Sequence, residues 1–306
     1  MNIESNRIND GISADPKEFV RSVNEEYQWQ LKKIAAKIAE TSNEKAVILL
    51  SGPSGSGKTT TAFMLQKMLG ELGCPTHTLS MDNYFCSLTE QEHALAAEGK
   101  MDLESPDRID KELLNEQIEA ISQCREVNVP QYDFGRSRRK DTTFPLKCSH
   151  GELVIFEGIH ALNPDVITVP EQKLTKLYVS VRARVTCGDI ILHPSKVRLM
   201  RRMVRDRNFR DRSLRETMNM FHSVENGENK YIMPYKYRSD YDIDTFMKYE
   251  LNAYRDVLLE DLRQMSDIPE LADVTEVMEN LVSMELADVT PDSLICEFIG
   301  NGEFKY

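Results

Sequence analysis

The chain is poor in cysteine, and the cysteines it has are scattered. Six occur in 306 residues, with no CxxC pair and no histidine at zinc-site spacing nearby: Cys74, Cys86, Cys124, Cys148, Cys187 and Cys296. A disulfide framework and a structural metal site are therefore not expected. Isolated cysteines of this kind are typical of a reducing compartment, which predicts a cytoplasmic protein.

Long hydrophobic runs are also missing. No apolar stretch approaches the roughly 20 residues of a membrane span, and the N-terminal residues MNIESNRINDGISADPKEF are polar and acidic. No signal peptide, transit peptide or membrane partner is expected. The composition, 41% hydrophobic and 29% charged, is ordinary for a globular protein with a sizeable core.

Positive charge is scarce overall, with 38 basic against 50 acidic residues and a net charge of -12. Such a chain repels nucleic acid, so no nucleic-acid partner is expected. One segment departs from this balance, because nine of the basic residues lie in KVRLMRRMVRDRNFRDRSLRE, residues 196–216. This arginine segment needs a local negative partner.

Hydrophobic periodicity predicts an α/β fold. Residues 1–44 are expected to hold a short flexible start and one helix, which Asp15 caps with Pro16 in its first position. From residue 45, short apolar runs alternate with amphipathic helices, and the runs are 46–51, 76–81, 152–157, 176–181 and 241–245. This alternation predicts a parallel sheet with helices on both faces.

The domain organisation follows from the same pattern. Residues 45–265 form the expected main domain, and residues 266–306 form an acidic helical extension packed on it. The hexamer ELADVT occurs twice in that extension, at 270–275 and 285–290, either by chance or as two similar helix starts. A homo-oligomer is left open.

A phosphate-binding loop follows the first expected strand. Residues 52–59, GPSGSGKT, satisfy the G-x-x-x-x-G-K-[ST] pattern between a strand and a helix. Glycines let backbone N–H groups surround a polyphosphate, Lys58 reaches its outer phosphates, and the Thr59 hydroxyl is a ligand for Mg²⁺. The residues expected to bind ATP here are Gly52, Pro53, Ser54, Gly55, Ser56, Gly57, Lys58, Thr59 and Thr60.

This loop alone does not separate a motor, a switch GTPase and a small-molecule kinase. A switch GTPase needs an N-K-x-D loop to read guanine, and the sequence has no such tetrapeptide. Two carboxylates at strand ends favour a kinase. Asp82 follows the second strand and Glu157 closes the third, so both should project toward the phosphates as a proton acceptor or as magnesium ligands.

With these parts in order, residues 46–260 resemble the phosphoribulokinase/uridine kinase family of P-loop kinases, and most closely its bacterial uridine-kinase-like branch. The motifs that carry the resemblance are GPSGSGKTT, MDNYF, DLESPDRID, VPQYDFGRSRR, FEGIHAL and RRMVRDRNFRDR. The resemblance implies a P-loop NTPase-type parallel sheet, and the arginine segment becomes a helical lid over ATP.

The resemblance also implies roles for single residues. Asp82 matches the catalytic base, and Thr59, Glu157 and Asp82 match magnesium positions. Lys58 and Arg205 are expected to act in catalysis. The lid arginines expected to close over ATP are Arg202, Arg205, Arg210 and Arg212. The acceptor is expected to contact Asp82, Phe85, Glu104, Tyr132, Phe134, Ser137 and Arg205.

Three departures from uridine–cytidine kinases concern the acceptor. Glu104 stands where they usually have an aspartate, Leu103 where they have a phenylalanine, and Ser137 where they have a base-reading histidine. Losing a hydrogen-bonding partner lowers discrimination. Around Ser137, the basic residues Arg136, Arg138 and Arg139 suit either an anionic acceptor or a solvated loop.

The expected activity is transfer of the ATP γ-phosphoryl group to a hydroxyl of a small molecule, with ATP and Mg²⁺ as cofactors. Uridine or cytidine is the first choice by resemblance, and another nucleoside, a pentose phosphate or pantothenate stays open. Two alternatives of other classes are a nucleic-acid-stimulated ATPase, which would place the arginine segment on a phosphate backbone, and an inactive nucleotide sensor.

Overall fold

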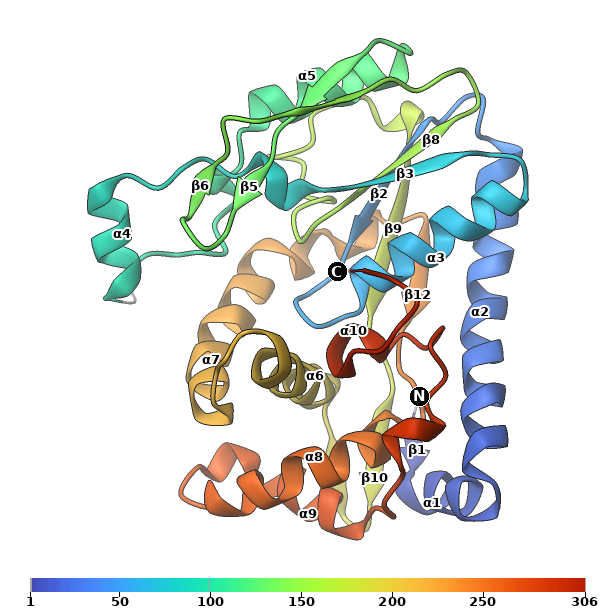
Figure 1. Cartoon of the computed structure of the whole chain (residues 1–306), viewed down its shortest axis with the longest axis vertical. Coiled ribbons are helices and arrows are strands. Elements are labelled where there is room, and N and C mark those ends of the chain that lie inside the picture. Colours follow the sequence, from blue (N-terminus) through green and yellow to red (C-terminus); the bar gives the residue numbers. More distant parts are fainter. Residues whose placement is uncertain (1, 99, 306) are drawn as a thin grey trace.

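The computed structural model describes residues 2–98 and 100–305. Its centre is a sheet of five parallel strands in the order β12-β9-β2-β8-β3 (Figure 1). The strands are β2 (Val47–Ser51), β3 (Thr76–Ser80), β8 (Leu153–Glu157), β9 (Leu174–Ser180) and β12 (Tyr241–Asp244). All five apolar runs are therefore strands, as the sequence predicted.

Helices cover both faces of this sheet, which confirms the predicted fold class. Alternate residues of a strand point to opposite faces, so Ile48 and Leu50 join one buried cluster while Val47 and Leu49 join another. The first cluster includes side chains of α2 (Pro16–Glu40), α3 (Lys58–Glu71), α6 (Pro194–Phe209) and α8 (Glu250–Gln264). The second includes side chains of α5 (Lys111–Ser122).

The start of the chain is structured, and the expectation of a flexible start was wrong. Strand β1 (Asn2–Glu4) pairs in parallel with β10 (Arg184–Cys187), and α1 (Ser5–Ala14) buries Ile8 and Ile12. Two apolar residues four positions apart are too few to reveal a helix by periodicity. Helix α2 begins as predicted, since the Asp15 side chain accepts a hydrogen bond from the Glu18 backbone N–H at 3.0 Å.

Smaller elements complete the fold. Strand β10 also pairs with β11 (Ile190–Leu192) to extend the small sheet that contains β1. There are also two antiparallel strand pairs, β4 (Val127–Val129) with β7 (Phe144–Leu146) and, between them in the chain, the hairpin of β5 (Tyr132–Asp133) and β6 (Arg138–Arg139). Further helices are α4 (Glu90–Ala97), α7 (Leu214–Tyr231) and α9 (Ala272–Asn280). Within the described residues, no helix is long and apolar enough to cross a membrane.

The arginine segment is helical, as predicted, and its helix α6 is anchored in the core. Val197, Leu199 and Met203 are fully buried, and α6 packs against α7, α8 and the C-terminal α10 (Cys296–Ile299). Most residues from 207 to 213 are exposed, that is, the end of α6 and the turn that leads into α7. Any closing motion would therefore involve this end of α6 and the turn after it rather than the whole of α6.

The C-terminal extension follows two different courses after its two ELADVT copies. The first copy leads into α9, whereas the second forms only a single 3-10 turn, Leu286–Asp288. Beyond it, Leu294 and Phe298 are fully buried in the same core as α6 and the sheet. Figure 1 shows this last segment, in red, beside the start of α3 and α6.

Candidate active site

The phosphate loop has the backbone that its glycines allow. Gly55 and Gly57 have φ of 75° and 82°, in the left-handed region that favours glycine. A Cβ on Gly52 would lie 2.2 Å from the Val179 carbonyl oxygen, so only glycine fits between the loop and β9. Two buried arginines of α6 fix the loop from outside, because Arg198 donates to the Ser54 carbonyl at 3.0 Å and Arg201 to the Gly55 carbonyl at 3.1 Å.

One cavity of about 380 Å³ opens beside this loop and gathers most of the predicted site residues. From the loop and the strand ends come Ser54, Gly55, Gly57, Lys58, Thr59, Asp82 and Glu157; from the arginine segment come Arg202, Arg205, Arg210 and Arg212; on the acceptor side lie Phe85, Leu103, Glu104 and Phe134. Residues separated by more than 150 positions thus meet at the carboxyl end of the parallel sheet, where α/β proteins bind ligands.

The two strand-end carboxylates face this cavity from neighbouring strands. Burial raises the pKa of Asp82, while the cations Lys58, Arg108 and Arg210 oppose the rise. Burial also raises the pKa of Glu157 to about 7; Lys58 opposes this rise and Asp82 adds to it. Two acids this close and this buried favour binding of a positive ion or uptake of a proton.

The arginines of the segment are arranged around one buried carboxylate. Asp206 has no exposed surface, and its Oδ1 accepts from the Arg205 guanidinium at 2.9 and 2.7 Å. Arg210 lies 3.4 Å and Arg212 3.9 Å from the same carboxylate. The Arg202 guanidinium instead donates to the Ser54 hydroxyl. Asp206 therefore holds three cations in place at the rim of the cavity.

An aromatic wall forms the acceptor side. The ring of Phe85 lies edge-on to those of Tyr132 and Phe134, with centroids 5.7 and 6.5 Å apart. Phe134 keeps 63% of its surface exposed, so it offers a free face for a planar group. Opposite, Glu104 lines the cavity and burial raises its pKa. Gly227 of α7 makes room for it, because a Cβ there would lie 2.5 Å from the Glu104 Cβ.

Two predicted acceptor residues, Tyr132 and Ser137, do not line the cavity. Tyr132 supports Phe134 and accepts a hydrogen bond from Arg108 at its hydroxyl, and Ser137 lies at the turn of the β5–β6 hairpin; neither lines the cavity. The neighbouring cations do not line it either. Arg139 pairs with Asp110 at 3.0 Å and donates to the Tyr84 carbonyl, and Arg136 and Arg138 are not cavity residues.

Among the residues at the site that were not predicted from the sequence, three have ionisable side chains. Arg108 lies 4.6 Å above the Phe85 ring and donates to the Leu103 carbonyl. His160 contacts the Glu104 carbonyl oxygen at 2.9 Å and so positions that loop. Both belong to motifs that carried the family resemblance, which was the available signal. Glu297 of α10 also lines the cavity, and no pattern in the sequence pointed to it.

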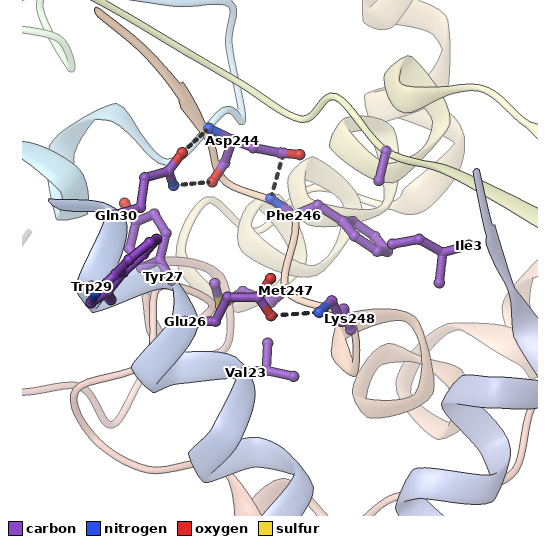
Figure 2. Close-up of a pocket in the computed structure, with 11 residues that line it drawn as sticks. Ile3, Val23, Glu26, Tyr27, Trp29, Gln30, Asp244, Phe246, Met247 and Lys248 are labelled. Carbon is purple, nitrogen blue, oxygen red and sulfur yellow. Dashed lines mark hydrogen bonds and ion pairs between the residues drawn. The ribbon is translucent and has the colours of Figure 1, made fainter. Parts of the chain in front are cut away.

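Two other features lie outside this site. A cavity of about 250 Å³ lies between α2 and the segment that follows β12 (Figure 2), lined in part by Trp29 and Phe246 and bordered by the Glu26–Lys248 ion pair. It shares no residue with the cavity at the phosphate loop.

Elsewhere, three possible metal ligands, His77, Cys148 and Glu152, bring their ligand atoms within 4.8 Å of one another. The spacing of these residues in the sequence did not predict this grouping.

The fold and the phosphate loop are those of a P-loop protein, and the family match identifies a P-loop kinase. The model described as "Phosphoribulokinase / Uridine kinase family" matches residues 47–251, and the chain belongs to this family. A uridine kinase from Borrelia duttonii (strain Ly) is 28% identical over 195 residues, 63% of this chain and 84% of that protein. Uridine-cytidine kinase-like 1 from Mus musculus is 33% identical over 197 residues, 63% of this chain and 32% of that protein.

The fold has a solved counterpart. A protein from Silicibacter sp. TM1040, provisionally described as a fructose transport system kinase, superposes with a TM-score of 0.51 at 17% identity. The match covers 69% of this chain and 98% of that one. At this identity the likeness supports the fold alone. The family match ends at residue 251, so α9, α10 and Glu297 lie outside it.

Proposed function

We propose that this P-loop kinase transfers the γ-phosphoryl group of ATP to a hydroxyl of a nucleoside, with uridine or cytidine as the first candidates. One observation carries the proposal: the phosphate loop, a buried strand-end carboxylate and four arginines line the same cavity as a partly exposed aromatic wall. Together these residues would bind a triphosphate, accept a proton from the acceptor hydroxyl and offer an aromatic surface for a planar acceptor group.

The donor set beside the phosphates fits a magnesium ion. The Thr59 hydroxyl and the Asp82 and Glu157 carboxylates line the same cavity, and oxygen ligands of this kind are those that Mg²⁺ prefers. The raised pKa of Glu157 marks a carboxylate whose charge has no full partner in the protein. When bound, the ion would neutralise charge on the phosphate oxygens.

The protein's own residues account for the transfer step. Asp82 accepts the proton of the acceptor hydroxyl, and the resulting oxygen forms a bond to the γ-phosphorus. The bond from that phosphorus to the oxygen bridging the β-phosphate breaks, and ADP leaves with the electron pair. Lys58 and Arg205 offset the negative charge of the phosphate oxygens, an effect worth about 10³–10⁵ in rate for one arginine in related chemistry.

The acceptor side supports a nucleoside over a small sugar phosphate. A base stacked on Phe134 and Phe85 would use the aromatic wall, and ribose hydroxyls would reach Glu104. An anionic acceptor would be repelled by Glu104 and Asp82, and the Arg139 guanidinium is already paired with Asp110. The inward orientation of Arg198, Arg201 and Arg202, all nearly fully buried, likewise disfavours the arginine segment as a nucleic-acid surface.

The test is an ATP-consumption screen over nucleosides, pentose phosphates and vitamin alcohols, with the phosphorylated product identified by mass. We expect product with uridine or cytidine. The variant Phe134→Ala should raise KM for the acceptor severalfold and leave KM for ATP unchanged. Product from another class of acceptor alone would overturn the nucleoside assignment, and ATP hydrolysis without any phosphorylated acceptor would overturn phosphotransfer.

A further inference from the structure

The C-terminal residues 297–304 lie along α3 (Figure 1), and Leu294 just before them lies against the phosphate loop. One stripe of α3, at spacings of three and four residues, meets them: Thr60 contacts Glu297, Phe63 stacks on Phe304 with ring centroids 5.6 Å apart, and Lys67 lies 3.3 Å from the Glu303 carboxylate. The segment is therefore held at three points along the helix that carries the phosphate loop.

Glu297 binds donors of the phosphate site itself. Its Oε2 accepts from the backbone N–H of Thr60 at 3.2 Å and from the Thr60 hydroxyl at 2.7 Å. Thr60 lies in the first turn of α3, at the helix N-terminus, where backbone N–H groups can bind an anion. In a phosphate loop these N–H groups cradle the nucleotide phosphates. A carboxylate of the chain thus occupies a position suited to a phosphate oxygen.

The surroundings of Glu297 show which atoms can move. Leu294 lies directly against the loop, since a Cβ on Gly57 would lie 2.9 Å from its side chain. Leu294, Ile295 and Phe298 are fully buried, so the backbone of α10 is fixed in the core. Glu297 is only half-buried and faces the cavity. Rotation of its side chain is the smallest movement that takes the Glu297 carboxylate away from Thr60.

We propose that Glu297 is an internal competitor of the nucleotide. Its carboxylate holds an anion position of the phosphate loop while the nucleotide is absent, and it must leave when a triphosphate binds. The inference rests on one part of the proposed function, namely that this cavity binds a nucleoside triphosphate. With Asp82, Glu104 and Glu157 lining the same cavity, Glu297 also adds a fourth carboxylate, which repels a polyanion.

The test is direct binding, measured by calorimetry without any acceptor present. The probes are ATP with Mg²⁺ and inorganic tripolyphosphate, which has no base, and the variants are Glu297→Gln and Glu297→Ala. We expect Kd for both probes to be at least about fivefold lower in the two Glu297 variants than in wild type. Such a difference would mean that Glu297 leaves the phosphate loop open to ligand in at most about one fifth of wild-type molecules. Glu303→Gln is the matched control, because Glu303 anchors the same segment on Lys67 away from the loop, and its Kd should equal that of wild type.

The outcomes separate this inference from the kinase proposal. Unchanged or weaker binding by both Glu297 variants, with thermal unfolding like that of wild type, overturns competition and makes Glu297 a supporting residue. Binding of neither probe by any variant overturns competition as well, together with ATP as the ligand. If the Glu297 variants bind both probes more tightly but the acceptor screen yields no phosphorylated product, the competition inference is supported and the phosphotransfer proposal is overturned.

Discussion

Arg201 and Glu250 form a bidentate ion pair in which both side chains are fully buried. Arg201 Nε donates to one carboxylate oxygen at 2.6 Å and one terminal nitrogen donates to the other at 2.9 Å. The other terminal nitrogen of Arg201 donates to the Gly55 carbonyl. This pair therefore joins α6 and α8 and fixes the phosphate loop to both, and it places an arginine of the cationic segment in a structural role.

Breaking this pair should be costly. Arg201→Met leaves a buried carboxylate without its partner, so we expect a loss of about 3–5 kcal/mol of unfolding free energy. Glu250→Leu should cost a similar amount. The double variant should lose less than the sum of the two by about 1–3 kcal/mol, because it removes both charges together. Urea unfolding of the four proteins measures this coupling, and strictly additive losses would contradict it.

Asp82 offers the sharpest test of the catalytic assignment. Asp82→Asn removes the proton acceptor while keeping the shape of the side chain, so kcat should fall by about 10²- to 10⁴-fold. ATP affinity should stay within a few fold, because the phosphate loop is unchanged. Lys58→Ala should lose both transfer and ATP affinity. Near-normal turnover by the Asp82→Asn enzyme in the acceptor screen would show that another group takes the proton.

The sheet and the phosphate loop could be predicted because each is encoded locally. A strand buried on both faces, such as residues 47–51, is a continuous apolar run, and the loop has a fixed spacing between a strand and a helix. The start of the chain was missed because Ile8 and Ile12 alone set no period. Glu297 could not be predicted, since its place at Thr60 depends on how a distant segment packs, and a single acidic residue within the apolar run 294–299 matches no motif.

The arginine segment was likewise predictable only in part. Its charge and its helix could be predicted from residues 196–216, and the family pattern singled out the four arginines that line the cavity, Arg202, Arg205, Arg210 and Arg212. Periodicity alone did not show that Arg198 and Arg201 belong to the core. Arg198 and Arg201 hold Glu228 and Glu250, whereas Arg205 and Arg210 surround Asp206 at the cavity. Helical spacing decides which side each guanidinium takes; Glu228 of α7 and Glu250 of α8 are partners from other helices, whereas Asp206 belongs to α6 itself.

Asp206 should act on catalysis through these arginines. Asp206→Asn keeps one acceptor oxygen for Arg205 but removes the negative charge that holds Arg205, Arg210 and Arg212 together. Since small misplacements of charged groups cost up to about 10²-fold in rate, kcat should fall about 10- to 100-fold, with a smaller change in KM for ATP. Asp261→Asn is the control, because its ion pair with Arg207 is about half exposed. A fall in both variants alike would point to a general loss of structure.

His160 predicts a pH dependence of stability. Burial lowers its pKa to about 4, and because the Glu104 carbonyl can only accept, the ring donates through Nε2 and is neutral. Nδ1 is buried without a hydrogen-bond partner, so protonation would place a charged N–H where nothing accepts it. The unfolded chain, with a pKa near 6.5, binds the proton more readily. The folded state therefore loses stability as pH falls from about 6.5 toward 4, by up to about 3 kcal/mol from this group.

The measurement compares wild type with His160→Gln, which can still donate to the Glu104 carbonyl but does not titrate. Urea unfolding at several pH values between 7.5 and 4.5 gives the difference in unfolding free energy between the two proteins. The carboxylates at the site contribute to both proteins and largely cancel in this difference. We expect wild type to be the more stable at pH 7.5 and its advantage to shrink as the solution is acidified. A difference that stays constant with pH would mean that His160 keeps an ordinary pKa in the folded protein.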